Sequence, residues 1–367
     1  MVKKVNIAFL LTRVSERGGI SRVVSILTDE LYKKNILGQI HIVSFQKKDE
    51  RGYAWNENLT IHELLDDTPS MKKGILKANI KLRGILSKND IDILVSCGHL
   101  VGPLGVLSSV FKKTKLIYWS HTSYIGSRNS NFRLFNEHIA ALFSKAVVSL
   151  TKVDKINYKK KTLAKNVFHI YNPVDKKLLS NKIAYDSNSK LIVSVGRLTY
   201  QKNFELLVDV AKLVLNKYPD HEWHIYGSGE NKDDIQHKIS NYNLQNKLFL
   251  KGQSNNLYEI YKNYSMMVMT SRYEGFPMTL LEGMAFGLPL VSFDIPTGPN
   301  EIIRENTNGF LIEPFDVEKM ADRICHLLEN KETRTQFSAK NIEFLTDFDM
   351  ESISPKWIQL FQSIVKQ

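Results

Sequence analysis

Short apolar runs alternate with amphipathic segments along the whole chain. Runs of this kind are typical of buried strands, and in the first half they predict strands at residues 5–11, 39–45, 91–96, 115–119, 146–150 and 167–170. In the second half the same pattern predicts strands at residues 191–195, 222–226, 248–250, 266–269 and 288–292. Because helical segments separate most of these strands, the sequence predicts an α/β fold of parallel sheets with helices on both faces.

Three helical segments have a distinctive composition. Residues 20–31 and 353–365 gather their apolar side chains on one side, as amphipathic helices do. Residues 71–86 interleave Lys and Arg with Ile and Leu, which fits a helix lying in a membrane interface. The same composition also fits a surface helix that packs its apolar face on a sheet.

The length predicts two domains, since 367 residues is about twice the size of a typical domain. Pro173 stiffens the chain near residues 171–175, and the polar stretch at 186–189 resembles a linker. We therefore expect the boundary near residue 172.

Positive charge is concentrated in the first half. Residues 1–172 carry 28 Lys and Arg against 13 Asp and Glu, a net charge of +15, whereas residues 173–367 carry 22 against 25, a net charge of −3. Such a field favours an anionic partner: nucleic acid, a diphosphate or an acidic membrane surface. A basic surface that serves only solubility remains the alternative.

The sequence shows no export or membrane-spanning signal. No apolar run reaches the roughly 18 residues that a spanning helix needs, and the N-terminus leads straight into a strand pattern. Cys97 and Cys325 are the only cysteines and lie far apart, which argues against a disulfide framework or a thiolate metal site. We expect a cytoplasmic location.

Residues 270–287 combine a strand, a loop and a helix in a way that suits a ligand. The loop follows the strand at 266–269 and a helical pattern begins after Pro277. The start of a helix presents unpaired backbone N–H groups that suit a phosphate. Glu274 and Glu282 could both face a ligand with several hydroxyls. Alternatively, Thr279–Glu282 forms a capping box in which Glu282 only reaches back to the helix start.

Glycine pairs occur after two other predicted strands. Gly18 and Gly19 precede the helix at 20–31, and Gly227 and Gly229 follow the strand at 222–226. Glycines let a backbone approach a ligand closely, although a plain flexible turn is the alternative at Gly18 and Gly19. Neither pair completes the dinucleotide fingerprint G-x-G-x-x-G.

Four polar residues follow predicted strands at positions where ligands gather. His99 and His121 follow strands of the first half, and Arg197 and Lys202 follow the strand at 191–195. Without further evidence each could be an ordinary polar loop residue.

Two of these motifs together resemble the retaining glycosyltransferases of family 4. One is the spacing from Glu274 to Glu282, with Gly275-Phe276-Pro277 after the first acid, and the other is Gly196-Arg197-Leu198 followed by Gln201-Lys202-Asn203. The resemblance covers nearly the whole chain. It implies the GT-B fold, two facing Rossmann-like doubly wound parallel-sheet domains with a cleft between them.

The resemblance also implies how the chain is divided. Residues 1–172 would form an acceptor-binding domain and residues 173–350 a nucleotide-sugar-binding domain. Residues 351–367 would form a terminal helix that returns to the first domain.

The resemblance implies a role for each candidate residue. Arg197 and Lys202 would stabilise the leaving diphosphate, Glu274 and His121 would contact the donor sugar, and Glu282 would accept from the ribose hydroxyls. The remaining contacts to acceptor, sugar, phosphate or nucleotide would come from Gly18, Gly19, Gly227, Gly229, Phe276, Met278 and Thr279. Asp-x-Asp triplets at 90–92 and 347–349 match a metal-binding pattern only loosely, so we expect no metal and no cofactor.

The expected activity is transfer of a hexose or N-acetylhexosamine from a nucleotide sugar, a UDP-sugar, to a glycan or lipid-linked acceptor. Residues 292–301 look like the version found in bacterial transferases that build surface glycans. We expect an anionic membrane surface as a further partner, at the inner face of the plasma membrane, and no nucleic acid. Two alternatives remain: a UDP-sugar 2-epimerase of the same fold and a non-catalytic GT-B binding partner.

Overall fold

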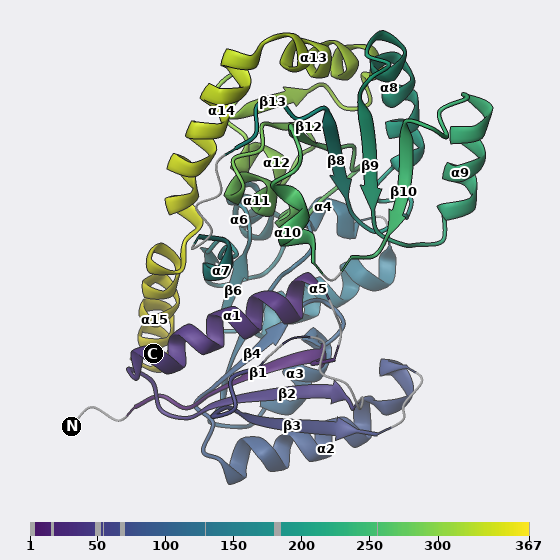
Figure 1. Ribbon diagram of the computed structural model, residues 1–367. Coiled ribbons are helices and arrows are strands. Elements are labelled where there is room, and N and C mark those ends of the chain that lie inside the picture. Colours follow the sequence, from purple (N-terminus) through teal and green to yellow (C-terminus); the bar gives the residue numbers. More distant parts are fainter. Residues whose placement is uncertain are drawn as a thin grey trace. The chain divides into compact units, whose positions relative to one another are not determined.

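The computed structural model describes residues 4–15, 18–47, 53, 55–66, 70–128, 130–179, 185–254 and 256–366 (Figure 1). The chain forms two compact units. Unit 1 comprises Met1–Pro173 and Met350–Gln367, and unit 2 comprises Val174–Asp349.

Unit 1 is built on a seven-stranded sheet in the order β3-β2-β1-β4-β5-β6-β7. Every strand pair in it is parallel, with Ile7 of β1 opposite Ile40 of β2 and Ile93 of β4. Its strands are β1 (Ile7–Arg13), β2 (Ile40–Gln46), β3 (Thr60–Leu65), β4 (Ile93–Cys97), β5 (Lys115–Trp119), β6 (Ala146–Ser149) and β7 (Val167–His169). Its helices are α1 (Gly19–Lys34), α2 (Met71–Lys88), α3 (Gly102–Ser109), α4 (Tyr124–Ser127), α5 (Asn131–Phe143), α6 (Lys152–Lys161) and α15 (Met350–Lys366).

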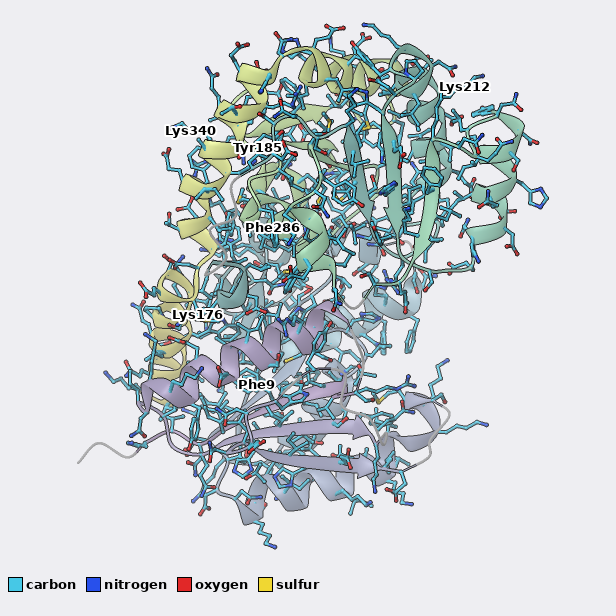
Figure 2. The ribbon with its side chains drawn as sticks, viewed as in Figure 1. Phe9, Lys176, Tyr185, Lys212, Phe286 and Lys340 are labelled. Atoms are coloured by element: carbon cyan, nitrogen blue, oxygen red, sulfur yellow. The ribbon has the colours of Figure 1, made fainter. Side chains whose placement is uncertain are left out.

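The last helix, α15, completes the core of unit 1. It packs beside α1 (Figure 1). The ring of Trp357 lies 4.6 Å from that of Trp119 on β5, and the ring of Phe361 lies 6.4 Å from that of Phe9 on β1, the residue labelled in Figure 2. Burial of these large rings stabilises the unit by the hydrophobic effect.

Unit 2 is built on a six-stranded parallel sheet in the order β10-β9-β8-β11-β12-β13. Its strands are β8 (Leu191–Val195), β9 (Glu222–Tyr226), β10 (Leu248–Gly252), β11 (Met266–Met269), β12 (Leu290–Phe293) and β13 (Gly309–Ile312). Its helices are α7 (Lys176–Leu179), α8 (Phe204–Lys217), α9 (Lys232–Asn241), α10 (Leu257–Tyr261), α11 (Met278–Ala285), α12 (Pro299–Ile302), α13 (Val317–Glu329), α14 (Lys331–Phe344) and the 3-10 helix Leu345–Phe348.

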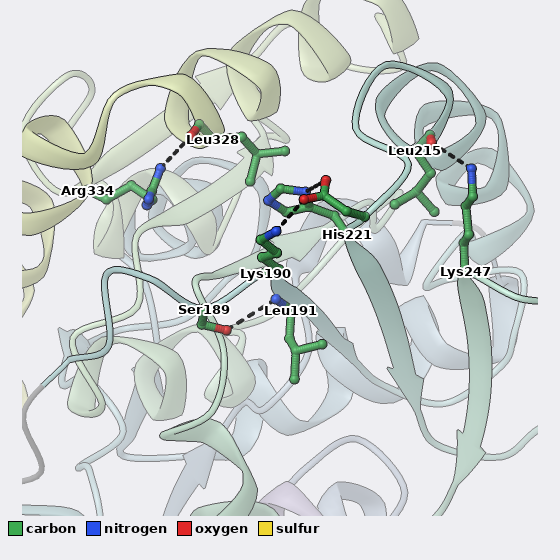
Figure 3. Close-up of polar contacts among 9 residues, drawn as sticks. Ser189, Lys190, Leu191, Leu215, His221, Lys247, Leu328 and Arg334 are labelled. Atoms are coloured by element: carbon green, nitrogen blue, oxygen red, sulfur yellow. Dashed lines mark hydrogen bonds and ion pairs between the residues drawn. The ribbon is translucent and has the colours of Figure 1, made fainter.

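Side-chain contacts to backbone tie the ends of these elements together (Figure 3). Ser189 Oγ accepts a hydrogen bond from Leu191 N at 3.1 Å where β8 begins. Lys247 Nζ donates to the Leu215 carbonyl of α8 at 3.2 Å, and Arg334 Nη1 of α14 donates to the Leu328 carbonyl of α13 at 2.8 Å. These hydrogen bonds join α8 to the segment before β10 and α14 to α13, in addition to the apolar packing of Leu215 and Leu328.

The prediction of two Rossmann-like parallel sheets is confirmed. Strands β3 and β13 were not predicted from the pattern, and each lies at one end of its sheet. Residues 91 and 92, predicted to open the strand at 91–96, instead precede β4. Asp90 there has a φ of 47°, and Asp92 Oδ2 accepts from Asn6 N. Among the described residues no helix is both long enough and apolar enough to span a membrane.

The strand order creates one switch point in each sheet. In unit 2 the chain runs from β8 to β9 and β10 on one side and then returns to β11 on the other side of β8. In unit 1 the same happens at β1, which has β2 on one side and β4 on the other. In unit 2 the loops after β8 and β11 lie side by side at this switch point, and such a place is where α/β sheets bind their ligands.

Candidate active site

A buried ion pair lies at the switch point of unit 2. Lys202, in the loop after β8, places its Nζ 2.6 Å from Oε1 of Glu274, in the loop after β11. The two side chains are only 14% and 8% exposed. Ser271 Oγ donates to the same carboxylate oxygen at 2.7 Å. The structure thus brings together two of the candidate residues and adds a hydroxyl that the sequence analysis did not single out.

Further hydrogen bonds hold the two loops against each other. Arg272 N donates to the Gln201 carbonyl at 2.8 Å, and Gln201 Nε2 donates to the Tyr273 carbonyl at 3.0 Å. Arg272 Nη2 donates to Asn203 Oδ1 at 2.7 Å. These contacts fix the backbone on both sides of the ion pair, so that the Lys202 and Glu274 side chains are preorganised.

The loop after β12 holds the backbone of Glu274. Thr297 Oγ1 donates to the backbone carbonyl of Glu274 at 2.6 Å. Thr297 is 1% exposed, so this contact is shielded from solvent. Ser271 and Thr297 lie in the stretches 270–287 and 292–301 of the sequence analysis, but neither was singled out there as a site residue.

Three glycines allow this close packing. A Cβ on Gly196 would lie 3.1–3.2 Å from the Lys202 side-chain carbons, so Gly196 leaves room for the lysine stem. Gly227 has a φ of +141°, and a Cβ there would lie 1.8 Å from the Gly196 carbonyl oxygen. A Cβ on Gly229 would lie 2.2 Å from the Leu198 carbonyl oxygen. Gly227 and Gly229 therefore let one loop press against the other.

Arg197 occupies the same loop as Lys202 but a different environment. Its side chain is exposed, and within the described part of the chain it makes no hydrogen bond or ion pair. Lys202 and Arg197 thus offer one preorganised cation and one cation open to an incoming anion.

Helix α11 begins directly after this loop. Pro277 is its N-cap residue, and Met278 and Thr279 form its first turn. Phe276 is buried, with its ring 5.8 Å from that of Phe348. Because Thr279 lies inside the helix and is not its N-cap, the capping-box alternative is wrong.

Glu282 on α11 has a specific partner. Its Oε2 accepts a hydrogen bond from Tyr261 Oη at 2.9 Å. Burial and the negative charge of Glu282 raise the pKa of Tyr261 well above its usual value, so the phenol stays a proton donor. No motif in the sequence pointed to Tyr261, because it comes from the separate helix α10.

The candidate residues of unit 1 lie at the carboxyl ends of β1 and β5. Gly18 is the N-cap residue of α1, and Gly19 opens the helix; residues 16 and 17 lie outside the described residues. The ring of His121 lies 4.4 Å from that of Trp119. Burial lowers the pKa of His121 to about 3, so the imidazole is neutral at pH 7. Its Nε2 is inaccessible to solvent and has no hydrogen-bond partner among the described residues.

His99, the other histidine singled out, follows β4. Burial and then the positive charge of Arg133 lower its pKa to about 4. It too is neutral at pH 7.

Metal ligands are not assembled in the part of the chain that the structure describes, where no group of three His, Cys, Asp or Glu side chains could hold an ion. Asp92 of the first Asp-x-Asp triplet accepts from the backbone at Asn6, and Asp347 of the second pairs with Arg304 at 2.8 Å.

Comparison with known proteins gives this geometry a context. Residues 175–344 match the profile of the family described as glycosyl transferases group 1. The chain is 27% identical over 351 residues to an uncharacterised glycosyltransferase of Haemophilus influenzae, which covers 96% of this chain and 98% of the relative. The protein is a glycosyltransferase.

Two further relatives of the glycosyltransferase have specific names. A poly(ribitol-phosphate) alpha-N-acetylglucosaminyltransferase of Staphylococcus aureus is 34% identical over 218 residues, which is 59% of this chain and 44% of that protein. An amylovoran biosynthesis glycosyltransferase of Erwinia amylovora is 29% identical over 359 residues, which is 95% of this chain and 97% of that protein.

Solved structures share the fold of the glycosyltransferase. Sucrose-phosphate synthase from Thermosynechococcus elongatus superposes with a TM-score of 0.85 at 16% identity, over 98% of this chain and 99% of that chain. A Staphylococcus aureus TarM mutant, solved with fondaparinux, alpha-GlcNAc-glycerol and UDP, superposes with a TM-score of 0.82 at 19% identity, over 98% and 100%. At these identities the likeness establishes the GT-B fold alone.

Proposed function

We propose that this glycosyltransferase moves a hexose or N-acetylhexosamine from a UDP-sugar to a glycan or lipid-linked acceptor, with retention of the anomeric configuration. The product would be a bacterial surface polysaccharide or glycolipid. The observation that carries the proposal is the buried pair of Lys202 and Glu274 at the switch point between β8 and β11. A cation beside a carboxylate suits a ligand that combines phosphate with hydroxyls.

Stabilisation of the leaving group is assigned to the loop after β8. Breaking the anomeric bond leaves negative charge on the diphosphate, which fixed positive groups stabilise. The ammonium of Lys202 has three N–H donors, and with one directed at Glu274 the others can reach a phosphate oxygen. Arg197 adds an exposed fork of donors, and the start of α11 adds backbone N–H groups and a favourable dipole.

Recognition of the donor sugar and of the nucleoside is assigned to side chains that accept or exchange hydrogen bonds. Glu274 would accept from sugar hydroxyls, and Glu282, oriented by Tyr261, would accept from the ribose. The neutral imidazole of His121 would exchange a hydrogen bond with the donor sugar. We assign no protein nucleophile: the departing phosphate takes the acceptor proton on the face it leaves, which retains the configuration.

The named relatives support the proposal. The Staphylococcus aureus relative is named as an alpha-N-acetylglucosaminyltransferase, the Erwinia amylovora relative acts in amylovoran biosynthesis, and TarM was solved with UDP. The proposal assigns the donor to unit 2 and the acceptor to unit 1.

A panel of nucleotide sugars tests the activity directly. We expect a UDP-sugar to raise the melting temperature most and to be consumed with an acceptor, giving a product with retained configuration by NMR. Lys202→Ala should lower kcat about 100-fold to 1,000-fold, as loss of one preorganised donor does. Lys238→Ala, which removes a lysine paired with Asp209 away from these loops, is the control. Conversion of the UDP-sugar to its 2-epimer without acceptor, or binding without turnover, would refute transfer.

A membrane surface completes the proposal for a lipid-linked acceptor. Helix α2 has no Asp or Glu, and Leu76 and Ile80 on it are each 73% exposed. Gly74, Ala78, Leu82 and Leu86 pack its other side on the core, so α2 both packs on unit 1 and exposes apolar residues. An exposed face of this composition fits an anionic lipid interface.

Neighbouring helices extend this face. Helix α3 packs against both α2 and α5, and Lys72 Nζ lies 5.1 Å from the Phe132 ring centre. Phe132, Phe135 and Phe143 of α5 are exposed, as is Phe111 after α3. We call these exposed residues the basic apolar face: Lys72, Leu76 and Ile80 of α2, Phe111 after α3, and Phe132, Phe135 and Phe143 of α5.

Vesicle flotation tests the basic apolar face. We expect the protein to float with phosphatidylglycerol vesicles at low salt, and Leu76→Glu with Ile80→Glu to abolish flotation while leaving transfer to a soluble acceptor intact. Leu213→Glu, at an exposed apolar position on α8 of unit 2, should float normally. Absence of flotation by the unmodified protein, or equal loss in the control, would refute this surface.

A further inference from the structure

A fully buried carboxylate lies beneath the loop that carries His121. Glu137 of α5 is 0% exposed. Its Oε2 accepts from Tyr118 Oη at 2.7 Å and also from Tyr158 Oη. Its Oε1 accepts from Thr122 Oγ1 at 2.9 Å. Ser127 Oγ of α4 also donates to Oε1, at 3.5 Å. Four hydroxyls, from β5, α6, the β5–α4 loop and α4, therefore converge on one side chain.

Burial of the Glu137 carboxylate costs free energy of folding. Glu137 has no ion-pair partner among the described residues, and burial raises its pKa. A buried carboxylate without a counter-ion costs free energy that an apolar side chain would avoid. We therefore expect the buried carboxylate of Glu137 to fix a particular conformation of the chain around it.

The conformation that it fixes is that of the turn around His121. Thr122 follows His121 directly and bonds to Glu137. Ser120 precedes His121, and its Oγ lies 2.9 Å from Tyr158 Oη and 3.2 Å from the Thr122 carbonyl oxygen. Both neighbours of the histidine are thus tied to the cluster, whereas His121 Nε2 itself has no partner in the described part of the chain.

We propose that Glu137 is a positioning residue, which through Thr122 holds the Ser120–Thr122 turn so that His121 presents its imidazole to the donor sugar. This inference rests on the proposed function, which gives His121 a sugar to contact. Oε1 holds the turn directly at Thr122. Oε2 anchors the carboxylate to Tyr118 and Tyr158, and of these two Tyr158 also bonds to Ser120 of the turn.

The contacts of Oε1 and those of Oε2, the two branches of the cluster, can be tested separately by substitution. Thr122→Val removes the link to the turn with little change in volume, and Glu137→Gln replaces the acceptor at Oε1 or Oε2 by a donor. We expect either change to lower kcat about 10-fold to 100-fold, since misplacing a contact group by about 1 Å can cost 100-fold. KM for the UDP-sugar should change less than about threefold in both variants, because His121 is only one of its contacts.

Controls distinguish positioning from general stability. Thr122→Ser keeps the hydroxyl and should retain activity. Tyr118→Phe removes a hydrogen bond of the other branch and should lower the melting temperature with kcat within about twofold. Thr122→Val combined with His121→Ala should be no worse than His121→Ala alone, because the coupled residues act through one group. Multiplied losses in the double variant, or equal losses of kcat in Tyr118→Phe and Thr122→Val, would overturn the inference.

A measurement independent of turnover separates this inference from the proposed function. We expect the His121 ring resonances in NMR spectra of the full chain to shift or broaden in Thr122→Val and Glu137→Gln but not in Tyr118→Phe. Unchanged resonances overturn the inference even if transfer is confirmed. Absence of transfer in the unmodified protein would refute the proposed function, while the NMR result would still decide the role of Glu137.

Discussion

Lys202 and Glu274 form an ion pair whose burial makes each partner depend on the other. Removing one partner of a buried pair leaves an uncompensated charge, which typically costs about 3–5 kcal/mol. We therefore expect Lys202→Met to lower the free energy of unfolding by about that amount, and the double variant with Glu274→Gln to be more stable than the single variant. Urea unfolding of the three proteins measures this coupling.

A more exposed pair provides the comparison. Lys238 and Asp209 are 2.7 Å apart with side chains 29% and 28% exposed. Lys238→Met should cost no more than about 1 kcal/mol, as exposed pairs do. Equal costs at the two pairs would show that the site pair is not desolvated.

Asp154 offers a prediction about pH. Its Oδ1 accepts from Tyr124 N, and burial raises its pKa to about 6 from 3.8. The folded protein therefore binds the proton more tightly than the unfolded chain, so this contribution to stability is present below pH 4 and is lost as the pH rises through 6. At 1.36 kcal/mol per unit, the loss is on the order of 3 kcal/mol at most.

The asparagine variant isolates this contribution. Asp154→Asn keeps an oxygen for Tyr124 N and cannot ionise. Relative to the unmodified protein, it should gain in free energy of unfolding between pH 4.5 and pH 7.5. If the difference between the two proteins stays constant over that range, Asp154 does not titrate as described.

At the scale of the element, the loops after β8 and β9 depend on glycine. A Cβ on Gly227 would collide with the Gly196 carbonyl, so Gly227→Ala should displace the loop that holds Arg197 and Lys202. We expect its affinity for UDP to fall at least about tenfold, given the sensitivity of binding groups to displacement. Isothermal titration calorimetry measures this.

Gly252 is a matched control for Gly227. The Gly227 N donates to the Gly252 carbonyl at 2.8 Å, and both residues have positive φ. A Cβ on Gly252 would meet nothing within 4 Å. Gly252→Ala should therefore cost only about 1 kcal/mol of backbone strain and leave UDP affinity unchanged. Equal loss of affinity in both variants would contradict the packing argument.

The strands could be predicted because buried parallel strands consist of continuous runs of apolar residues. Every predicted strand is present with ends within about two residues. The unpredicted strands β3 and β13 differ from such runs in two ways: β3 contains His62 and Glu63, which interrupt its apolar pattern, and β13 (Gly309–Ile312) is apolar but only four residues long. A local pattern carries little information about such strands.

Partners that come from distant elements could not be predicted in the same way. Spacing along the chain brought Glu274 and Glu282 to attention, but it left the capping box open as an explanation of Glu282. The bond from Tyr261 joins α10 to α11, and the bond from Thr297 joins the loops after β12 and β11. Such contacts follow from strand order and loop packing, which no single segment specifies.

At the scale of the whole molecule, the last helix connects the far end of the chain to the first unit. Helix α15 follows unit 2 in sequence, yet Ile353, Trp357, Leu360, Phe361 and Ile364 are all buried in unit 1. Lys115 Nζ of β5 donates to the Ile364 carbonyl at 2.9 Å. Folding of unit 1 therefore requires residues that follow unit 2 in the sequence.

Substitution of Trp357 tests this dependence. Trp357→Ala removes the ring that packs on Trp119 and should destabilise unit 1 by about 3–5 kcal/mol, as large-to-small changes in a core do. Trp357 Nε1 is buried with no hydrogen-bond partner in the described part of the chain, so Trp357→Phe, which fills most of the space without that donor, should cost less than about 1.5 kcal/mol.

Hydrogen exchange read by mass spectrometry assigns the effect to a unit. In Trp357→Ala, peptides from β1, β4 and β5 should exchange faster, because their core has lost a ring, whereas peptides from β8 and β11 should keep their protection. Faster exchange in both sheets would mean that the units unfold together. In that case α15 would stabilise the whole molecule and not unit 1 alone.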